Sequence, residues 1–146
     1  MQSLDNTAAL TKLNAAADFV KKHDASSGKL GVIGFCMGGS LALLLACHNK
    51  EVQASVPFYG KVPDESVLRS LSCPVTYVYA GLDQWITRDE PDRLEGALKK
   101  FGKPGQVLRY PNADHAFFND TRKEVYKPDD AADAWKRAVG FLKANL

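Results

Sequence analysis

Apolar residues recur with the spacing of an amphipathic helix in several stretches of the chain. One side of the first predicted helix, over residues 5–23, carries Leu10, Leu13, Ala17 and Val20. Thr87 and Glu90 have the spacing of a capping box, which predicts a helix that starts there and ends at Gly102. The pattern predicts further helices over residues 40–46, residues 64–71 and a closing stretch marked by Ala131, Trp135, Ala138 and Leu142.

Short runs rich in β-branched and aromatic residues lie between the predicted helices. They predict strands over residues 30–35, 54–59, 74–80 and 107–110. Helices that alternate with strands favour parallel pairing, because each helix returns the chain across the sheet before the next strand begins. We therefore predict one α/β domain over residues 1–146, with three layers and a mainly parallel four-stranded sheet flanked by helices. In such sheets ligands bind beyond the carboxyl ends of the strands.

Composition and charge narrow the possible functions. The chain of 146 residues is 45% hydrophobic, which is enough apolar content for a packed core. The net charge is +2 and the basic residues are spread among acidic ones, so nucleic-acid and membrane-surface binding gain little support. The sequence has no basic leader with an apolar run and no stretch that is long enough to span a bilayer. We expect a soluble, cytoplasmic protein that uses no cofactor.

The segment after the first predicted strand has the spacing of a nucleophile elbow. It reads Gly34-Phe35-Cys36-Met37-Gly38-Gly39, the G-x-S-x-G pattern with cysteine in place of serine. We expect a strained turn at Cys36, with Gly34 and Gly38 required because side chains there would collide. The sulfur would lie at the amino end of the next helix, where the helix dipole stabilises a thiolate. The alternative is a buried, inert cysteine, which is our interpretation of Cys47 and Cys73.

Other chemistries of this segment are less favoured. A glycine-rich turn between strand and helix is typical of phosphate-binding loops, but no Lys-Ser or Lys-Thr follows Gly39 and the GxGxxG register is absent. The three cysteines include no CxxC pair, so neither a disulfide framework nor a zinc site is indicated. A redox-sensing thiol at Cys36 would lack a resolving cysteine nearby in sequence.

A nucleophile of this kind needs a base, and the chain has three histidines. His23 and His48 fall near the ends of predicted helices, where a histidine usually acts as a favourable charge beside carbonyl groups. His115 lies in the loop after the fourth predicted strand, at the same edge of the sheet as Cys36. It is therefore the candidate base, with an ordinary surface histidine as the alternative.

Asp83 is the candidate acid that orients His115. It follows the third predicted strand, so its carboxylate projects at the same edge and can hold the imidazole in the required tautomer. Asp89 is expected to cap a helix, Asp114 adjoins His115 too closely to face its ring, and Asp120 is a further competitor. A metal site made of Asp114, His115 and Asp120 is disfavoured, because it has one histidine and no clustered partner. The chain order of nucleophile, acid and histidine is that of α/β-hydrolases.

These motifs resemble the dienelactone hydrolase family, also called carboxymethylenebutenolidase, and the resemblance covers nearly the whole chain. It is carried by the cysteine elbow at residues 34–39, Phe58-Tyr59-Gly60, Gly81-Leu82-Asp83, the segment Asp114-His115-Ala116-Phe117-Phe118-Asn119, and Ala131-Ala132-Asp133-Ala134-Trp135. It implies a Cys-His-Asp triad with the N–H of Met37 as one oxyanion donor. It also implies hydrolysis of small ester or lactone substrates through a thioester intermediate.

Aromatic residues beside the candidate triad are possible walls of a substrate pocket. The candidates are Phe35, Tyr59, Trp85, Phe117, Phe118 and Asn119. For Trp85, Phe117 and Phe118, ordinary packing is an equal alternative. In family members that act on dienelactone, an arginine binds the substrate carboxylate near the histidine loop. Here Asn119 stands in that neighbourhood, with Arg122 close by, so dienelactone itself is not the expected substrate.

The resemblance places this sequence in the carboxyl-side part of the family fold. The family has several strands before the helix that opens this chain, and they supply a second oxyanion N–H, a carboxylate near the thiol and another substrate arginine. The predicted strand 30–35 is apolar on both faces, yet no earlier strand is predicted to pair with it. We expect a second copy or a partner segment to cover this edge, and a non-catalytic α/β-hydrolase-like protein is the rival to a hydrolase.

Overall fold

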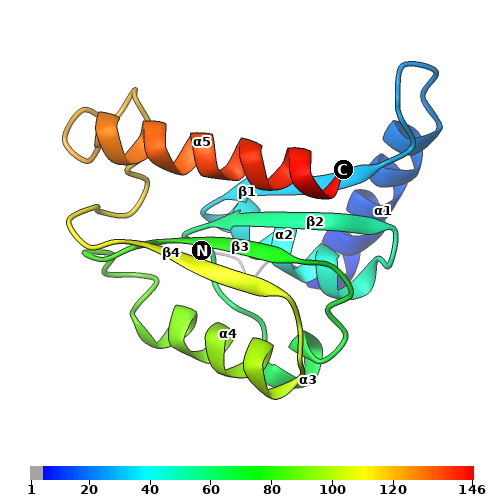
Figure 1. Ribbon diagram of the computed structural model, residues 1–146, viewed down its shortest axis with the longest axis horizontal. Coiled ribbons are helices and arrows are strands. Elements are labelled where there is room, and N and C mark those ends of the chain that lie inside the picture. Colours follow the sequence, from blue (N-terminus) through cyan, green and yellow to red (C-terminus); the bar gives the residue numbers. More distant parts are fainter. Residues whose placement is uncertain (1–4) are drawn as a thin grey trace.

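Four strands form one parallel sheet in the computed structural model, which describes residues 5–146 (Figure 1). They are β1 (Leu30–Phe35), β2 (Val52–Phe58), β3 (Val75–Ala80) and β4 (Gly105–Tyr110). The strands lie side by side in chain order, and each neighbouring pair is parallel. Their carboxyl ends therefore meet at one edge of the sheet, as the α/β prediction requires.

The helices complete three layers. They are α1 (Asn6–Lys22), α2 (Met37–His48), α3 (Glu65–Leu68), α4 (Asp89–Lys100) and α5 (Pro128–Asn145). Strands added in one direction through right-handed crossovers place their connecting helices on the same face. Accordingly α2, α3 and α4 lie on one face, and α5 crosses the opposite face over β2 and β3 (Figure 1). Helix α1 packs against α2 and β1 at one side of the sheet.

Several boundaries differ from the predictions. Helix α2 begins at Met37, three residues before its predicted start, because Gly38 and Gly39 already belong to the helix. Helix α3 ends at Leu68, and the chain continues in turns to residue 71. Strand β4 begins at Gly105, since Gly105 and Gln106 already pair with β3. The predicted end of α4 is confirmed: Gly102 has a φ of 61°, which glycine adopts without strain.

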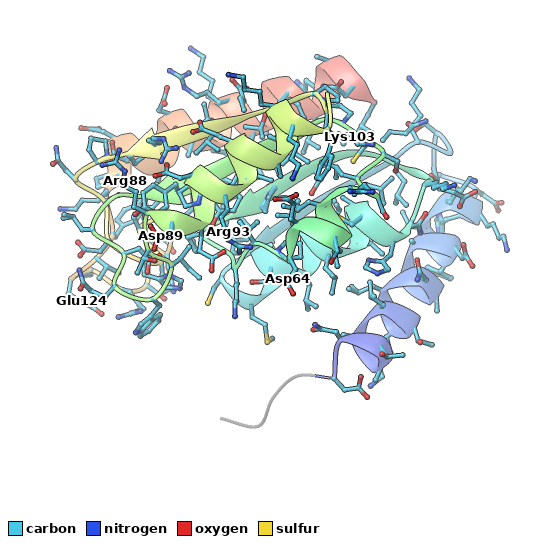
Figure 2. The ribbon with its side chains drawn as sticks, turned by 90° about the horizontal axis from the view of Figure 1, so that it is seen from below. Asp64, Arg88, Asp89, Arg93, Lys103 and Glu124 are labelled. Atoms are coloured by element: carbon cyan, nitrogen blue, oxygen red, sulfur yellow. The ribbon has the colours of Figure 1, made fainter. Side chains whose placement is uncertain are left out.

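The capping box at Thr87 and Glu90 is wrong. Helix α4 begins after Arg88, and no side chain caps its first turn. The Glu90 carboxylate instead accepts hydrogen bonds from the backbone N–H of Val62 at 2.9 Å and from Arg93 at 2.8 Å. Figure 2 shows Arg93 on α4. Glu90 therefore links the segment after β2 to α4 through hydrogen bonds. The spacing of residues within α4 does not predict this long-range contact.

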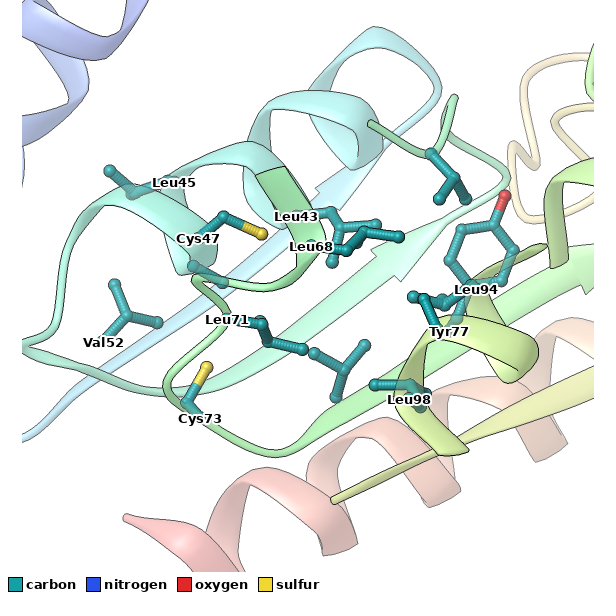
Figure 3. Close-up of a cluster of buried hydrophobic side chains, with 14 of the residues drawn as sticks. Leu43, Leu45, Cys47, Val52, Leu68, Leu71, Cys73, Tyr77, Leu94 and Leu98 are labelled. Carbon is teal, nitrogen blue, oxygen red and sulfur yellow. The ribbon is translucent and has the colours of Figure 1, made fainter. Parts of the chain in front are cut away.

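Two apolar clusters fill the spaces between the layers. The larger cluster lies between the sheet and the helices α1, α2 and α4, and Figure 3 shows part of it. The second lies under α5 and includes Ala131, Ala134 and Ala138. Cys47 and Cys73 are buried in the larger cluster, as predicted for structural cysteines. Within residues 5–146, no helix has both the length and the apolar content to cross a lipid bilayer.

Candidate active site

Cys36 occupies a sharp turn between β1 and α2. Its backbone has a φ of 55° and a ψ of −119°, a conformation that non-glycine residues rarely adopt. The turn is held by hydrogen bonds from Cys36 N to Phe58 O at 3.0 Å and from Ser40 N to Cys36 O at 3.1 Å. The side chain is exposed. The expected strained elbow is therefore present, with its sulfur accessible to a substrate.

Close backbone packing explains part of the glycine pattern. A Cβ at Gly34 would lie 2.0 Å from Gly38 O, and a Cβ at Gly39 would lie 2.4 Å from Phe58 O, so neither position accepts a side chain. A Cβ at Gly38 would meet no atom within 4 Å. The expectation that Gly38 is required to avoid a collision is therefore wrong. Gly34 has no room because the Gly38 backbone itself approaches it.

The elbow places the sulfur at the amino end of α2. Cys36 is the residue that precedes the first turn of this 12-residue helix, and Met37 is the first residue within it. The first N–H groups of a helix have no partner inside the helix, and its dipole favours negative charge nearby. The backbone N–H of Met37 could therefore donate a hydrogen bond to an oxyanion on a carbon atom that is bonded to the sulfur.

Asp83 and His115 form a hydrogen-bonded pair at the same edge of the sheet. His115 Nδ1 lies 2.6 Å from Asp83 Oδ2, and both side chains are largely buried. The other carboxylate oxygen accepts hydrogen bonds from the backbone N–H groups of Trp85 at 2.8 Å and Ile86 at 2.9 Å. These bonds fix the carboxylate, so it can hold the imidazole in one tautomer and orientation.

This arrangement leaves Nε2 of His115 as the atom available for proton transfer. Within residues 5–146, it is a buried side-chain nitrogen that has no hydrogen-bond partner, and no hydrogen bond joins it to Cys36. Tyr59 packs beside His115, with 5.0 Å between the two ring centroids. Burial, the Cys36 sulfur and the Asp83 carboxylate raise the pKa of the Tyr59 hydroxyl, so this hydroxyl remains protonated.

Backbone strain collects around these groups. Among the described residues, the non-glycine positions with positive φ are Cys36 at 55°, Tyr59 at 36° and Ala116 at 65°. Each lies just beyond the carboxyl end of a strand or next to His115. Strained residues persist where the surrounding structure holds them, and they cluster at functional sites. Their common location supports the identification of this edge of the sheet as a site.

The predicted pocket residues include an exposed group and a buried group. Trp85 is 72% exposed and contacts His115, while Phe35 is 37% exposed and packs against Phe118 with 5.0 Å between ring centroids. Phe117 is fully buried in the core under α5, so packing is its role. Asn119 is exposed, and its side-chain oxygen accepts hydrogen bonds from Thr121.

A hollow beside the elbow has no counterpart among the sequence predictions. It has a volume of about 510 Å³ and lies between the amino ends of α1 and α2 and the segment after β2. Its lining includes Met37, Ser40, Leu44, Lys61 and Val67. The backbone N–H of Lys61 donates to Ser40 Oγ at 2.7 Å, which joins its two walls. Because the walls are distant in sequence, no local pattern marks them.

Comparison with known proteins identifies the family. The model of the family described as "Dienelactone hydrolase family" matches residues 1–146. A "Putative carboxymethylenebutenolidase" of Methylorubrum extorquens is 35% identical over 145 residues, which cover 92% of this chain and 50% of that protein. One of the same name from Aquifex aeolicus is 35% identical over 136 residues, covering 90% of this chain and 58% of that protein.

Solved structures show the same fold. A "Putative Dienelactone Hydrolase" from Klebsiella pneumoniae has a TM-score of 0.86 and 28% identity, covering 93% of this chain and 60% of its own. The "Dienelactone Hydrolase-like Promiscuous Phospotriesterase P91" has a TM-score of 0.87 at 20% identity, which bears on the fold alone. The chain spans about half the length of the curated relatives it matches.

Proposed function

Because the chain belongs to the dienelactone hydrolase family, we propose that it is a catalytic α/β-hydrolase-like domain that cleaves small ester or lactone substrates. Cys36 is the nucleophile, His115 the general base and Asp83 the group that orients it. The observation that carries the proposal is the strained, exposed Cys36 at the sheet edge that also holds the Asp83–His115 hydrogen bond of 2.6 Å.

The first half of the reaction forms a thioester. The Cys36 thiol proton passes to Nε2 of His115, and the sulfur attacks the carbonyl carbon of the substrate. The resulting oxyanion accepts a hydrogen bond from the N–H of Met37. The carbon–oxygen bond then breaks, and the departing oxygen takes the proton from His115. Asp83 stabilises the imidazolium between these steps by accepting the hydrogen bond of its Nδ1–H.

The second half releases the acid. Water attacks the thioester carbon while His115 Nε2 takes one of its protons. The carbon–sulfur bond then breaks, and the departing sulfur takes that proton from His115, which restores the Cys36 thiol and the neutral imidazole. The missing hydrogen bond between Cys36 and His115 is compatible with this sequence of steps, because catalytic hydrogen bonds are often long without substrate. Small esters with good leaving groups suit a thiolate, since such groups depart without full protonation.

Two further properties follow as proposals. The edge of β1 that is unpaired among the described residues is covered in the working protein by a second copy or a partner segment, because β1 is apolar on both faces, as a central strand of a parallel sheet is. If that segment also completes the oxyanion hole, the isolated chain is a non-catalytic α/β-hydrolase-like subunit.

Cytoplasmic location is supported by three free cysteines, which are typical of a reducing compartment.

Hydrolysis of p-nitrophenyl acetate tests the nucleophile. We expect the Cys36→Ala variant to lose turnover, while Cys73→Ala, which alters a buried thiol, keeps it. In the His115→Asn variant, deacylation lacks its base, so an acetyl group should be found on Cys36 by mass spectrometry. Equal rates for the original chain and Cys36→Ala would remove Cys36 from the mechanism.

A further inference from the structure

Trp85 presents an exposed aromatic surface beside the group that moves protons. Its ring centroid lies 4.8 Å from that of His115, with the two ring planes inclined by 59°. The side chain is nevertheless 72% exposed, although burial of an indole is normally favourable. Most of the ring is therefore available to another molecule that approaches His115.

The triad itself fixes the backbone that carries this ring. One oxygen of Asp83 accepts hydrogen bonds from the N–H groups of Trp85 and Ile86, while the other oxygen binds His115. The carboxylate thus sets the position of the imidazole and of the indole backbone together. A surface that is ordered before a ligand arrives loses less conformational freedom on binding.

The chemistry of the site decides which part of a substrate approaches Trp85. The oxygen of the leaving group takes a proton from His115 Nε2, so the leaving group must lie beside the imidazole. The side chain that packs on the imidazole and remains open to solvent is Trp85. A planar, apolar leaving group in this position is able to stack on the indole.

We propose that Trp85 is a specificity-determining residue, a platform that binds the aromatic leaving group of an aryl ester next to His115. The proposal rests on the hydrolase function above and names its substrate class. A stacked aromatic pair has a more favourable interaction free energy than an aromatic ring packed against a saturated group of equal size. We therefore expect a preference of about 3- to 10-fold for an aryl over a cycloalkyl ester.

Binding to an inactive variant provides the test. The chain has two tryptophans, so Trp85 is the sole indole in a Cys36→Ala, Trp135→Phe variant. Titration with phenyl acetate should change its fluorescence, with a Kd about 3- to 10-fold below that of cyclohexyl acetate. Saturation-transfer NMR measures both ligands in a Cys36→Ala, Trp85→Leu variant, where the two Kd values should become equal.

Matched controls separate stacking from general apolar contact. Phe19 on α1 is 70% exposed, and Phe19→Leu in the Cys36→Ala background should leave the preference unchanged. Equal Kd values for the two esters, a preference that survives Trp85→Leu, or no binding of either ester would overturn the platform. If the preference is found but hydrolysis does not depend on Cys36, the hydrolase proposal fails while the aromatic platform stands.

Discussion

At Cys36 the chain holds the proposed nucleophile on a backbone that a cysteine adopts only under strain. Such a conformation costs roughly 1–3 kcal/mol and requires compensation from the surrounding structure. The hydrogen bond from Cys36 N to Phe58 O, at 3.0 Å, and the packing of Gly39 against the same carbonyl supply it. The strain therefore aims the sulfur outward, whereas the other two cysteines point into the core.

This contrast predicts selective alkylation. Burial raises the pKa of Cys47 to about 12 and the pKa of Cys73 to about 11, so near neutral pH both remain protonated as well as inaccessible. Iodoacetamide should add one equivalent to the folded chain, at Cys36, and none to Cys36→Ala. Peptide mass spectrometry locates the label. All three cysteines should react in denaturant, and native labelling of Cys47 or Cys73 would contradict their buried placement.

Asp83→Asn should separate catalysis from stability. The amide oxygen can still accept hydrogen bonds from the N–H groups of Trp85 and Ile86, but the variant lacks the charge that we propose stabilises the His115 imidazolium. We expect kcat for p-nitrophenyl acetate to fall by roughly 100- to 10,000-fold with little change in KM or in Tm. A variant that retains full kcat would show that Asp83 does not orient the base.

The triad candidates were accessible from the sequence, while their detailed contacts were not. Cys36, Asp83 and His115 each follow a predicted strand, so parallel pairing alone predicts one shared edge. The sequence holds no comparable signal for Phe117, because its burial depends on α5 packing over the sheet. Tyr59 was expected in a pocket, yet its position against His115 depends on a strained backbone that its neighbours impose.

Among the elements, β1 and α1 follow their predicted ranges closely because local apolar spacing decides them. The start of α4 does not, since Glu90 forms its hydrogen bonds with Val62 and Arg93 and does not cap the helix. The extra residues of β4 likewise arise from pairing with β3, which spacing within β4 cannot reveal. Local pattern therefore predicts which elements exist, and tertiary contacts adjust their ends.

The elbow between β1 and α2 predicts opposite effects for two neighbouring glycines. Gly34→Ala would place a Cβ 2.0 Å from Gly38 O, so the strand and helix must separate, and we expect a loss of about 3 kcal/mol or more in the free energy of unfolding. Gly38→Ala meets open space inside α2, where alanine is the better helix former, and should stabilise by up to about 1 kcal/mol.

Urea unfolding followed by circular dichroism compares the two variants. Because both replace glycine with alanine within five residues of each other, the difference reports the backbone contact and not the added methyl group. Equal stability of the two variants would show that the close approach of Gly34 to Gly38 does not hold the elbow together.

For the whole molecule, the β1 side of the sheet exposes apolar residues of both a strand and a helix. Within the part of the chain that the structure describes, strand β1 has a neighbour on one side only, and its central residues Val32 and Ile33 are half-buried although both are apolar. Helix α1, which packs against β1, also carries exposed Phe19 and Val20. Parallel sheets are normally covered on both faces and at their apolar edges. We therefore expect another chain to bind on this side of the molecule.

The open edge predicts that the purified chain associates with itself. Two copies of β1 can pair through their free N–H and C=O groups, so light scattering should show a mass above that of the 16.0 kDa monomer as concentration rises.

Val32→Lys places a charge in this edge and should restore the monomer, because pairing would then bury the ammonium group. Phe19→Lys alters α1 instead and should leave association intact if the strands pair. A monomeric original chain from micromolar to millimolar concentration would exclude this edge as a self-association surface, and loss of association in Phe19→Lys alone would assign it to the helix.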